Sequence, residues 1–260
     1  MNSLYRPPAS QQIYKATVPP EYHDFSVEQY FSLRFSYQSK EAWIAQILNG
    51  DITVNGKKAH PGWILREGDS IITHAGVRQE PPADCSLNVV YQDRYIRVFN
   101  KPAPIPVHPS GRYFQNSMTE VLKKVFPEEV PRPVQRLDAT TTGLIVFART
   151  RQAAGFLMKE FQNHRVQKEY LALVKGKPEN KYFTLNAPIG VVNGAQRGVG
   201  EGIKNPKPAV TKVECLTTTN DHSVLKVIPL SGRTNQIRVH LSNHRLPILN
   251  DDVYGEGDSG

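Results

Sequence analysis

The sequence of 260 residues has few cysteines and no long apolar run. Its two cysteines, Cys85 and Cys215, form no CxxC pair, so reduced thiols in a cytoplasmic protein are expected. No stretch of about 18 apolar residues occurs, and a transmembrane helix is therefore not expected. The first twenty residues contain four prolines and no apolar core, so we expect no signal peptide there.

Motifs for bound metals, nucleotides or acyl transfer are missing as well. The glycine-rich loop expected from Gly190 to Gly202 lacks the GK[ST] ending and the strand-to-helix setting of a phosphate loop. His240 and His244 have the spacing of a zinc-binding helix, but HLSNH contains no central glutamate and suggests no third ligand. Ser231 is not part of a GxSxG turn. We therefore expect neither a metal nor a small-molecule cofactor.

Acidic residues are fewer than basic ones. The 24 Asp and Glu residues stand against 32 Lys and Arg residues, which gives a net charge of +8 and a pI near 9.4. A hydrophobic content of 39% with 22% charged residues is typical of a globular protein. The positive excess favours a polyanionic partner, most often nucleic acid, although many basic proteins bind none.

Composition divides the chain into four parts. Residues 1–22 are rich in Pro, Gln and Ser and lack periodicity, which is typical of an extended arm. Residues 23–75 combine short helical and strand patterns and predict a small domain. Residues 76–86, GVRQEPPADCS, have the composition of a linker. Residues 87–260 are long enough for one large domain.

The small domain has an αβ pattern. Ser26 and Ser39 are suitable N-caps for two helices, and Asn55-Gly56 predicts a hairpin turn between short strands. The block IAQILNGDITVNGKKAHPGWILREGDSI resembles the small RNA-binding domain first described in the fourth small-subunit ribosomal protein. Basic residues of this part are candidates for phosphate contacts, with ordinary solvated charges as the alternative. The candidates are Arg34, Lys40, Lys57 and Lys58.

In the large domain, strand patterns outnumber helical ones. Met118–Phe126 and Ala153–Phe161 have helical spacing. The segment KEYLALV alternates as a strand, with Tyr170 on one face together with every second residue after it. Further strands are expected at residues 87–92, 95–100, 210–216 and 224–230. We therefore expect an α+β fold with a mixed, mainly antiparallel central sheet flanked by helices and loops.

One acid lies where a catalytic group would be expected. In Pro133–Ala148, PVQRLDATTTGLIVFA, Asp138 is on a loop that runs into the apolar run Gly143–Ala148. This run predicts a strand with both faces covered, and loops beside rigid strands commonly carry catalytic groups. A surface Arg-Asp pair is the alternative.

A second stretch, LSGRTNQIRVHL, indicates an anion site. Thr234 is a suitable N-cap for a helix, so Arg233 lies just before the helix start. An arginine beside free backbone N–H groups suits a carboxylate or a phosphate, with surface capping as the alternative.

Three blocks in order, QRLDATTTG, KEYLALVKG and SGRTNQIRVHL, resemble the RluA-type family of RNA pseudouridine synthases. The resemblance also includes Asn100-Lys101-Pro102 and covers about Leu87 to Gly255. It implies an enzyme that moves the glycosidic bond of a flipped-out uridine from N1 to C5 of the base.

The resemblance also implies roles for particular residues. Asp138 is expected to be the catalytic residue, as nucleophile at the sugar or as base at C2′, and Tyr170 to take the proton from C5. Arg233 is expected to pair with Asp138 and to keep it ionised. Arg136 is expected to pry the target nucleotide out of the stack. Three further basic residues are expected to contact RNA: Lys101, Lys168 and Arg238.

The chain departs from the family pattern at several positions. Gln135 and Asn235 replace the usual histidines and Thr142 replaces a serine, so in an active enzyme neither histidine is an obligatory proton carrier. Arg245 and Asn250 stand where glycines are usual, and Arg adopts left-handed backbone poorly. Family members generally continue with further strands after the segment that corresponds to DDVYG, whereas this sequence stops at Gly260. One alternative is therefore that the chain is shortened at its C-terminus.

We therefore expect an enzyme that isomerises specific uridines in structured RNA, in large-subunit ribosomal RNA or alternatively in transfer RNA. It is expected to be a cytoplasmic monomer without a membrane partner. A non-catalytic RNA-binding protein on the same scaffold is the alternative, favoured by the departures at Gln135, at Asn235 and at the C-terminus.

Overall fold

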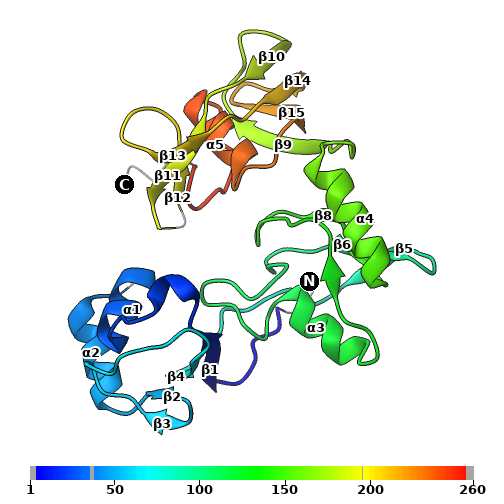
Figure 1. The fold of residues 1–260 in the computed structure, drawn as a ribbon. Helices are drawn as coiled ribbons and strands as arrows, with labels where there is room; N and C mark the ends of the chain where they lie inside the picture. Colours follow the sequence, from blue (N-terminus) through cyan, green and yellow to red (C-terminus); the bar gives the residue numbers. More distant parts are fainter. Residues whose placement is uncertain (1–3, 36–37, 195, 256–260) are drawn as a thin grey trace. The chain divides into compact units, whose positions relative to one another are not determined.

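The structure is a computed structural model that describes residues 4–35, 38–194 and 196–255 (Figure 1). It contains two compact units. Unit 1 comprises Met1–Tyr91, Val98–Pro131 and Ala139–Ile145, and unit 2 comprises Gln92–Arg97, Arg132–Asp138 and Val146–Gly260. The expected α+β class with mainly antiparallel sheets is confirmed. Within the described ranges no helix is long and apolar enough to cross a membrane.

The first part of unit 1 is a small αβ structure, as expected. Ser26 caps α1 and forms a reciprocal capping box with Gln29, and the Ser39 side chain caps α2. Asn55 and Gly56 both have positive φ and join two paired strands, β2 and β3. The sheet has the order β1-β4-β2-β3. The elements are β1 (Ser10–Thr17), a 3-10 turn η1 (Pro20–Tyr22), α1 (Val27–Arg34), α2 (Lys40–Leu48), β2 (Ile52–Val54), β3 (Lys57–Lys58) and β4 (Ser70–Arg78).

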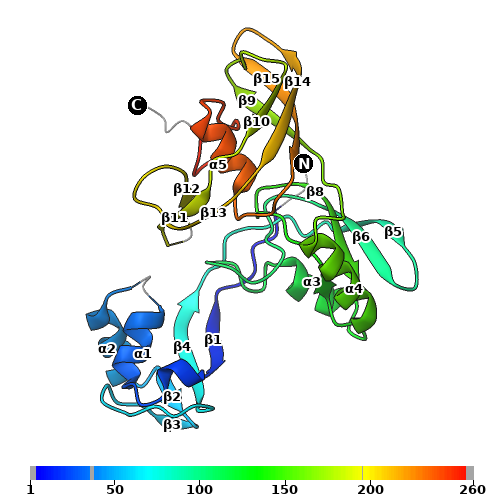
Figure 2. The ribbon, with the colours of Figure 1, turned by 45° about the horizontal axis from the view of Figure 1, so that its top comes forward.

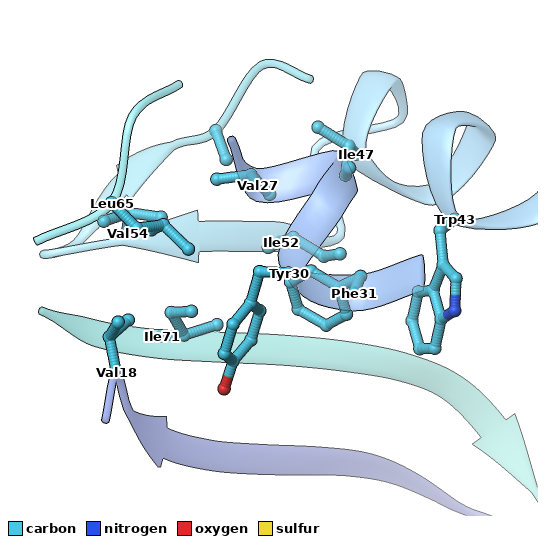
Figure 3. Close-up of a cluster of buried hydrophobic side chains, with 11 residues drawn as sticks. Val18, Val27, Tyr30, Phe31, Trp43, Ile47, Ile52, Val54, Leu65 and Ile71 are labelled. Carbon is cyan, nitrogen blue, oxygen red and sulfur yellow. The ribbon is translucent and has the colours of Figure 1, made fainter. Parts of the chain in front are cut away.

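This small structure has its own hydrophobic core. Tyr30 and Phe31 of α1 and Trp43 of α2 are buried together with apolar side chains of the strands, including Ile52 and Ile71. Figure 3 shows these side chains between the helices and the strands. The ring centroids of Phe31 and Trp43 are 4.7 Å apart. Burial of several aromatic rings at this density stabilises a domain of such small size.

Two segments of unit 1 differ from the sequence prediction. Ser10–Thr17, expected within an extended arm, is strand β1 and pairs with β4. Glu80, expected in a linker, is only 2% exposed. Its carboxylate accepts hydrogen bonds of 2.8, 2.8 and 2.9 Å from the backbone N–H groups of three successive residues, Phe114, Gln115 and Asn116. Three donors aimed at one buried carboxylate fix this segment.

A further sheet has the order β5-β6-β8-β7. Its strand β8 is the apolar run that follows Asp138, and the prediction of a strand there is confirmed. Leu144 within it is 63% exposed, however, so the expectation that both faces are covered is wrong at this position. The elements are β5 (Asn88–Gln92), β6 (Ile96–Lys101), α3 (Met118–Val125), β7 (Arg132–Pro133), β8 (Gly143–Ala148) and α4 (Arg151–Gln162).

The main sheet of unit 2 has the order β10-β14-β15-β9 and carries helix α5 against one face (Figures 1 and 2). Ala172 and Val174 of β9 are buried with Leu241 of α5, whereas Leu171 and Leu173 are exposed. The predicted alternation of β9 is therefore confirmed, and Tyr170 packs against the α5 side of the sheet. The elements are β9 (Tyr170–Lys175), β10 (Tyr182–Leu185), β14 (Thr211–Thr218), β15 (His222–Pro229) and α5 (Gln236–Asn243).

The glycine-rich stretch expected to be a loop contains a small antiparallel sheet with the order β12-β11-β13. Its strands are β11 (Ile189–Asn193), β12 (Gln196–Gly198) and β13 (Lys204–Lys207). Glycine is required here for close backbone approach, because a Cβ at Gly190 would lie 2.8 Å from the carbonyl oxygen of Lys204. The glycines therefore allow tight strand pairing where their frequency predicted a loop.

Candidate active site

Asp138 lies on the loop before β8, and its partner is Arg238 of α5. Arg238 Nη1 donates to Asp138 Oδ2 at 3.2 Å, with the two side chains 14% and 24% exposed. The same guanidinium donates from Nε and Nη2 to Asp251, at 2.7 Å each, and its carbon lies 5.0 Å from the ring centroid of Tyr254. Hydrogen bonding to Asp251 and then the charges of both aspartates raise the pKa of Arg238 against the opposing effect of burial. Arg238 is thus a fixed positive charge between two carboxylates.

The expected pairing of Arg233 with Asp138 is wrong. Arg233 Nε donates to the carbonyl oxygen of Pro208 at 2.9 Å, and the side chain is exposed. Arg233 lies ahead of the helix, whereas Arg238 lies in its first turns, where it meets both aspartates. The expectation that Arg238 contacts RNA conflicts with the same geometry, because its donors face Asp138 and Asp251.

Asn235 lies between Asp138 and Tyr254. Its carboxamide is 2.8 Å from Oδ2 of Asp138 and 2.9 Å from the hydroxyl of Tyr254. Because a carboxylate only accepts, the amide nitrogen faces Asp138 and the amide oxygen accepts from Tyr254. The Tyr254 hydroxyl in turn accepts from the backbone N–H of Arg197 at 2.9 Å. Asp138 is therefore held by an amide as well as by a guanidinium.

The start of α5 explains this use of Asn235. The helix begins at Gln236, and its N-cap is Asn235 with a left-handed φ of 56°, where Thr234 was expected. Asn tolerates this backbone conformation better than most residues. The side chain of Asn235 makes no cap hydrogen bond, because it is turned towards Asp138.

Gln236 shapes the turn before α5, a role that sequence reasoning missed. Its side chain is buried; its carbonyl oxygen accepts from the Ser231 hydroxyl at 2.8 Å and from the Arg233 N–H at 3.0 Å. Its nitrogen donates to the carbonyl oxygen of Val210 and to the hydroxyl of Thr211, at 3.0 Å each. The sequence did contain a signal for this role. Gln236 is a polar residue at the start of the expected helix, where only Arg233 and the N-cap were considered. All hydrogen-bonding positions of the amide are used, so the turn is rigid.

Asp251 was also missed by the sequence reasoning. Its side chain is only 4% exposed, and Oδ1 accepts from the N–H groups of Val253 and Tyr254 at 3.0 Å each. Burial raises the pKa of Asp251, but the hydrogen bonds from Arg238 and from these two N–H groups outweigh burial and leave the pKa below its ordinary value. The segment around Asp251 thus fixes the guanidinium that also donates to Asp138.

Tyr170 is the first residue of β9, and its pKa is affected by the charge of Asp138. Burial, and then the negative charge of Asp138, raise the pKa of Tyr170 above its ordinary value. The structure thus joins the sequence blocks of Asp138 and Arg238 by an ion pair, and the charge of Asp138 acts on Tyr170. The phenol of Tyr170 is therefore protonated at neutral pH.

Lys101 does not contact solvent, and the prediction that it binds RNA is wrong. Its side chain is fully buried, and Nζ donates to the carbonyl oxygens of Pro102, Ile105 and Ala139, at 2.9, 2.7 and 3.1 Å. Burial of an ammonium group is tolerated when its donors are satisfied in this way. Lys101 thus fixes the backbone at Ala139, the residue after Asp138.

The other basic residues singled out in the sequence have varied surroundings. Arg136 is exposed and has no ion pair within the described residues. Arg34 lies against the rings of Tyr22, Tyr30 and Phe35, at 5.4 to 5.7 Å. Lys168 is half-buried, and burial lowers its pKa. Lys40 pairs with Glu28 at 3.2 Å, and Lys57 and Lys58 are exposed on β3.

Gln135 lies three residues before Asp138. Its side-chain oxygen is 3.4 Å from the N–H of Val146 on β8. The described ranges contain no group of three or more His, Cys, Asp or Glu residues placed to hold a metal ion. His240, one of the pair with zinc-like spacing, is buried between Thr211 and the carbonyl oxygen of Ala187, at 2.8 and 2.9 Å.

Comparison with known proteins matches this chain to one family. Residues 95–243 match the family described as RNA pseudouridylate synthase. The chain is 33% identical over 252 residues to the Saccharomyces cerevisiae protein named mitochondrial tRNA pseudouridine(32) synthase, covering 94% of this chain and 54% of the relative. It is 33% identical over 249 residues to ribosomal large subunit pseudouridine synthase D of Pseudomonas aeruginosa, covering 92% of this chain and 77% of the relative.

A solved structure supports the same match. The structure of human RNA pseudouridylate synthase domain containing 1 superposes with a TM-score of 0.59 at 30% identity, over 68% of this chain and 73% of that chain. The present chain spans about half the length of the yeast relative and 46% of the human relative named pseudouridylate synthase RPUSD2.

Proposed function

Since the chain belongs to the RNA pseudouridylate synthase family, we propose that it isomerises uridine in RNA to pseudouridine, with Asp138 as the catalytic residue. The observation that carries this proposal is the position of Asp138 on a loop, where the guanidinium of Arg238 donates to its carboxylate at 3.2 Å and where its charge contributes to the raised pKa of Tyr170. A carboxylate fixed in this way can attack C1′ of the ribose or take a proton from C2′.

Arg238 and Asn235 orient the Asp138 carboxylate. Both donate to Asp138 Oδ2, and the amide nitrogen of Asn235 also reaches Oδ1 at 3.3 Å. Donors that are already in place need no reorganisation when charge moves in the transition state. Asn235 supplies a donor without an ionisable ring, so this support does not vary with pH near neutrality.

Tyr170 is the base for the C5 proton, but only after the charge on Asp138 has been consumed. While Asp138 is ionised, burial and this charge keep the phenol protonated. Attack of Asp138 on C1′ breaks the glycosidic bond to N1 and releases the base as an anion, and removal of the C2′ proton by Asp138 expels the base in the same form. Either step consumes the charge of Asp138. One of the two effects that raise the pKa of Tyr170 is then absent, while burial remains. Tyr170 donates its proton to N1 of the detached base and takes the proton from C5 once C5 is joined to C1′.

RNA binding is shared by other parts of the chain in this proposal. Arg136, exposed two residues before Asp138, enters the stack as the target nucleotide leaves it. The small αβ structure of residues 23–75, which resembles the RNA-binding domain of a ribosomal protein, contributes phosphate contacts through Arg34, Lys57 and Lys58. Alanine at both Lys57 and Lys58 should weaken RNA binding at low salt more than at high salt.

The substrate proposed is structured large-subunit ribosomal RNA, with transfer RNA as the alternative. One relative is named for the large ribosomal subunit and another for a transfer RNA. The yeast relative is named as mitochondrial. The cysteine usage of the present chain leads us to propose action in the cytoplasm, and we propose that the chain acts as a monomer.

The test uses RNA labelled with tritium at C5 of uridine, because isomerisation releases this hydrogen. The wild-type protein should release tritium from ribosomal or transfer RNA, and Asp138→Asn should not. Asp252→Asn is the matched control, since Asp252 is 75% exposed and lies at the edge of the same cluster. If the wild-type protein binds both RNAs and releases no tritium from either, the non-catalytic alternative is correct.

A further inference from the structure

A cleft of about 360 Å³ lies beside the small sheet of unit 2, at the turn before α5. Its basic lining residues are Arg197 on β12, Lys207 on β13 and Arg233 in the turn. All nine lining residues belong to the described part of the chain, and none of them is acidic. We call this cleft the basic pocket.

The three cations of the basic pocket retain donors for a ligand. Arg197 uses Nη1 on the carbonyl oxygens of Gly194 and Gln196, and Arg233 uses Nε on Pro208. Each guanidinium has five N–H donors, so several remain on both residues. The Lys207 side chain is exposed and has no hydrogen-bond or ion-pair partner in the described part of the chain. Positive charges that gather without a counter-charge favour an anion.

The pocket is also built on fixed backbone. Arg233 is fixed at its N–H by Gln236, and Arg197 at its N–H by Tyr254. Lys168 is a fourth cation near the pocket. Its Nζ lies 3.8 Å from the position that a Cβ on Gly232 would occupy, and Gly232 lines the pocket. The guanidinium groups themselves are held by carbonyl oxygens. Guanidinium groups held in this way suit the two non-bridging oxygens of a phosphate, and less orientational freedom is lost on binding.

The pocket is connected to the catalytic carboxylate through the chain. Thr234 lines the pocket, and the next residue, Asn235, donates to Asp138. Tyr254 links the same amide to the backbone of Arg197. A phosphate bound here would therefore be fixed by the elements that fix Asp138. In RNA, each sugar is flanked by phosphodiester groups.

We infer that the basic pocket binds a backbone phosphodiester of the substrate RNA close to the nucleotide on which Asp138 acts. This inference rests on the proposed function. The pocket sets the register of the RNA strand, so that the ribose of the target uridine, rather than of a neighbour, meets Asp138. Lys207 contributes chiefly affinity, and the two arginines contribute orientation.

The test compares Lys207→Ala with Lys212→Ala, both made in the Asp138→Asn protein so that RNA is not turned over. Lys212 is exposed on β14 and does not line the pocket, so both variants lose one positive charge from an exposed lysine. The dissociation constant of a fluorescent, uridine-rich RNA stem-loop is measured by anisotropy over a series of KCl concentrations. Lys207→Ala should lower the slope of log affinity against log salt by about 0.7 to 0.9, and Lys212→Ala should leave it unchanged.

Arg197→Lys adds a check on orientation. In the active protein it should reduce tritium release from saturating RNA more than it weakens RNA binding, because a lysine keeps the charge and loses the fork of donors. Circular dichroism confirms that each variant is folded, and Lys207→Gln replaces Lys207→Ala if the alanine variant does not fold.

Equal salt slopes for the Lys207 and Lys212 variants would overturn the inference. A small-anion site would show itself differently: Lys207→Ala would abolish binding of inorganic phosphate and leave the RNA slope unchanged, which also overturns it. A changed slope without tritium release by the wild-type protein would support the pocket and reject the proposed enzymatic function, so the two failures can be distinguished.

Discussion

The substitution Asp251→Asn tests the arrangement that holds Arg238. Asp251 is 4% exposed and Arg238 14% exposed, and two N–O distances of 2.7 Å join them. Removing one partner of a buried ion pair costs about 3 to 5 kcal/mol. Asparagine keeps the shape and some of the hydrogen bonds, so we expect a loss at the lower end, about 3 kcal/mol. For a domain of this size that corresponds to a decrease in melting temperature of roughly 6 to 12 °C.

The assay is thermal and urea unfolding followed by circular dichroism, with Asp252→Asn as the control. Asp252 is the adjacent residue and lies 3.5 Å from the same guanidinium, but it is 75% exposed. An exposed pair contributes about 0 to 1 kcal/mol, so the control should unfold almost as the wild type does. The chain has two compact units, and Asp251 and Arg238 both lie in unit 2. If the two units unfold in separate transitions, only the transition of unit 2 should shift.

The pH dependence gives an independent check. The pKa of Asp251 is lowered in the folded protein, so its contribution to stability is complete above the unfolded pKa of about 3.9. The contribution is lost as the pH falls below that value, through the folded pKa. The stability difference between wild type and Asp251→Asn should therefore be constant from pH 7 to about 5 and should shrink at lower pH. This account of the ion pair would be refuted if Asp251→Asn lowered the free energy of unfolding no more than Asp252→Asn does. It would also be refuted if the stability difference between wild type and Asp251→Asn persisted in strong acid.

Three further predictions concern other parts of the site. Asn235→Asp places two carboxylates within about 3 Å, so one of them must take up a proton. Tritium release should fall at least tenfold at pH 7 and should recover in Asn235→His. An Asn235→Asp protein with unimpaired tritium release would reject the contact assigned between Asn235 and Asp138. Tyr170→Phe should lower the rate by about 100-fold or more at saturating RNA with unchanged RNA affinity, as measured by tritium release and anisotropy. Arg245 has a left-handed φ of 58°, so Arg245→Gly should raise the free energy of unfolding by about 0.5 to 1 kcal/mol in urea titrations, and a loss of stability would show that the arginine side chain makes a compensating contact.

Local chemistry allowed much of the fold to be predicted from sequence. Ser26 and Ser39 cap their helices because a hydroxyl near the start of a helix satisfies a free N–H whatever lies further away. The alternation after Tyr170 predicted which residues of β9 face α5. The left-handed backbone at Arg245 and Asn250 also follows from the resemblance, since glycine is usual at both positions.

The partner of Asp138 could not be predicted in the same way. Arg233 and Arg238 are five residues apart, and only the observed helix start, at Gln236, places Arg233 ahead of the helix and Arg238 in its first turns, where it meets Asp138. That start depends on the Asn235 side chain, which is used on Asp138 and Tyr254 rather than as a cap. Lys101 was misjudged for a related reason: a charged side chain is usually exposed, and only the convergence of three carbonyl oxygens makes its burial possible.

The burial of Glu80 determines how this protein can be divided for experiments. The composition of residues 76–86, in which prolines follow Glu80, suggests that a catalytic fragment could begin at Leu87, after the expected linker. Such a fragment would leave the N–H groups of Phe114, Gln115 and Asn116 without their carboxylate, at about 1 to 3 kcal/mol for each donor that water does not reach. A fragment that begins a few residues earlier and retains Glu80 keeps these contacts. Loss of activity in the shorter fragment alone would thus report misfolding near residues 114–116 and would say nothing about RNA binding by the first 75 residues.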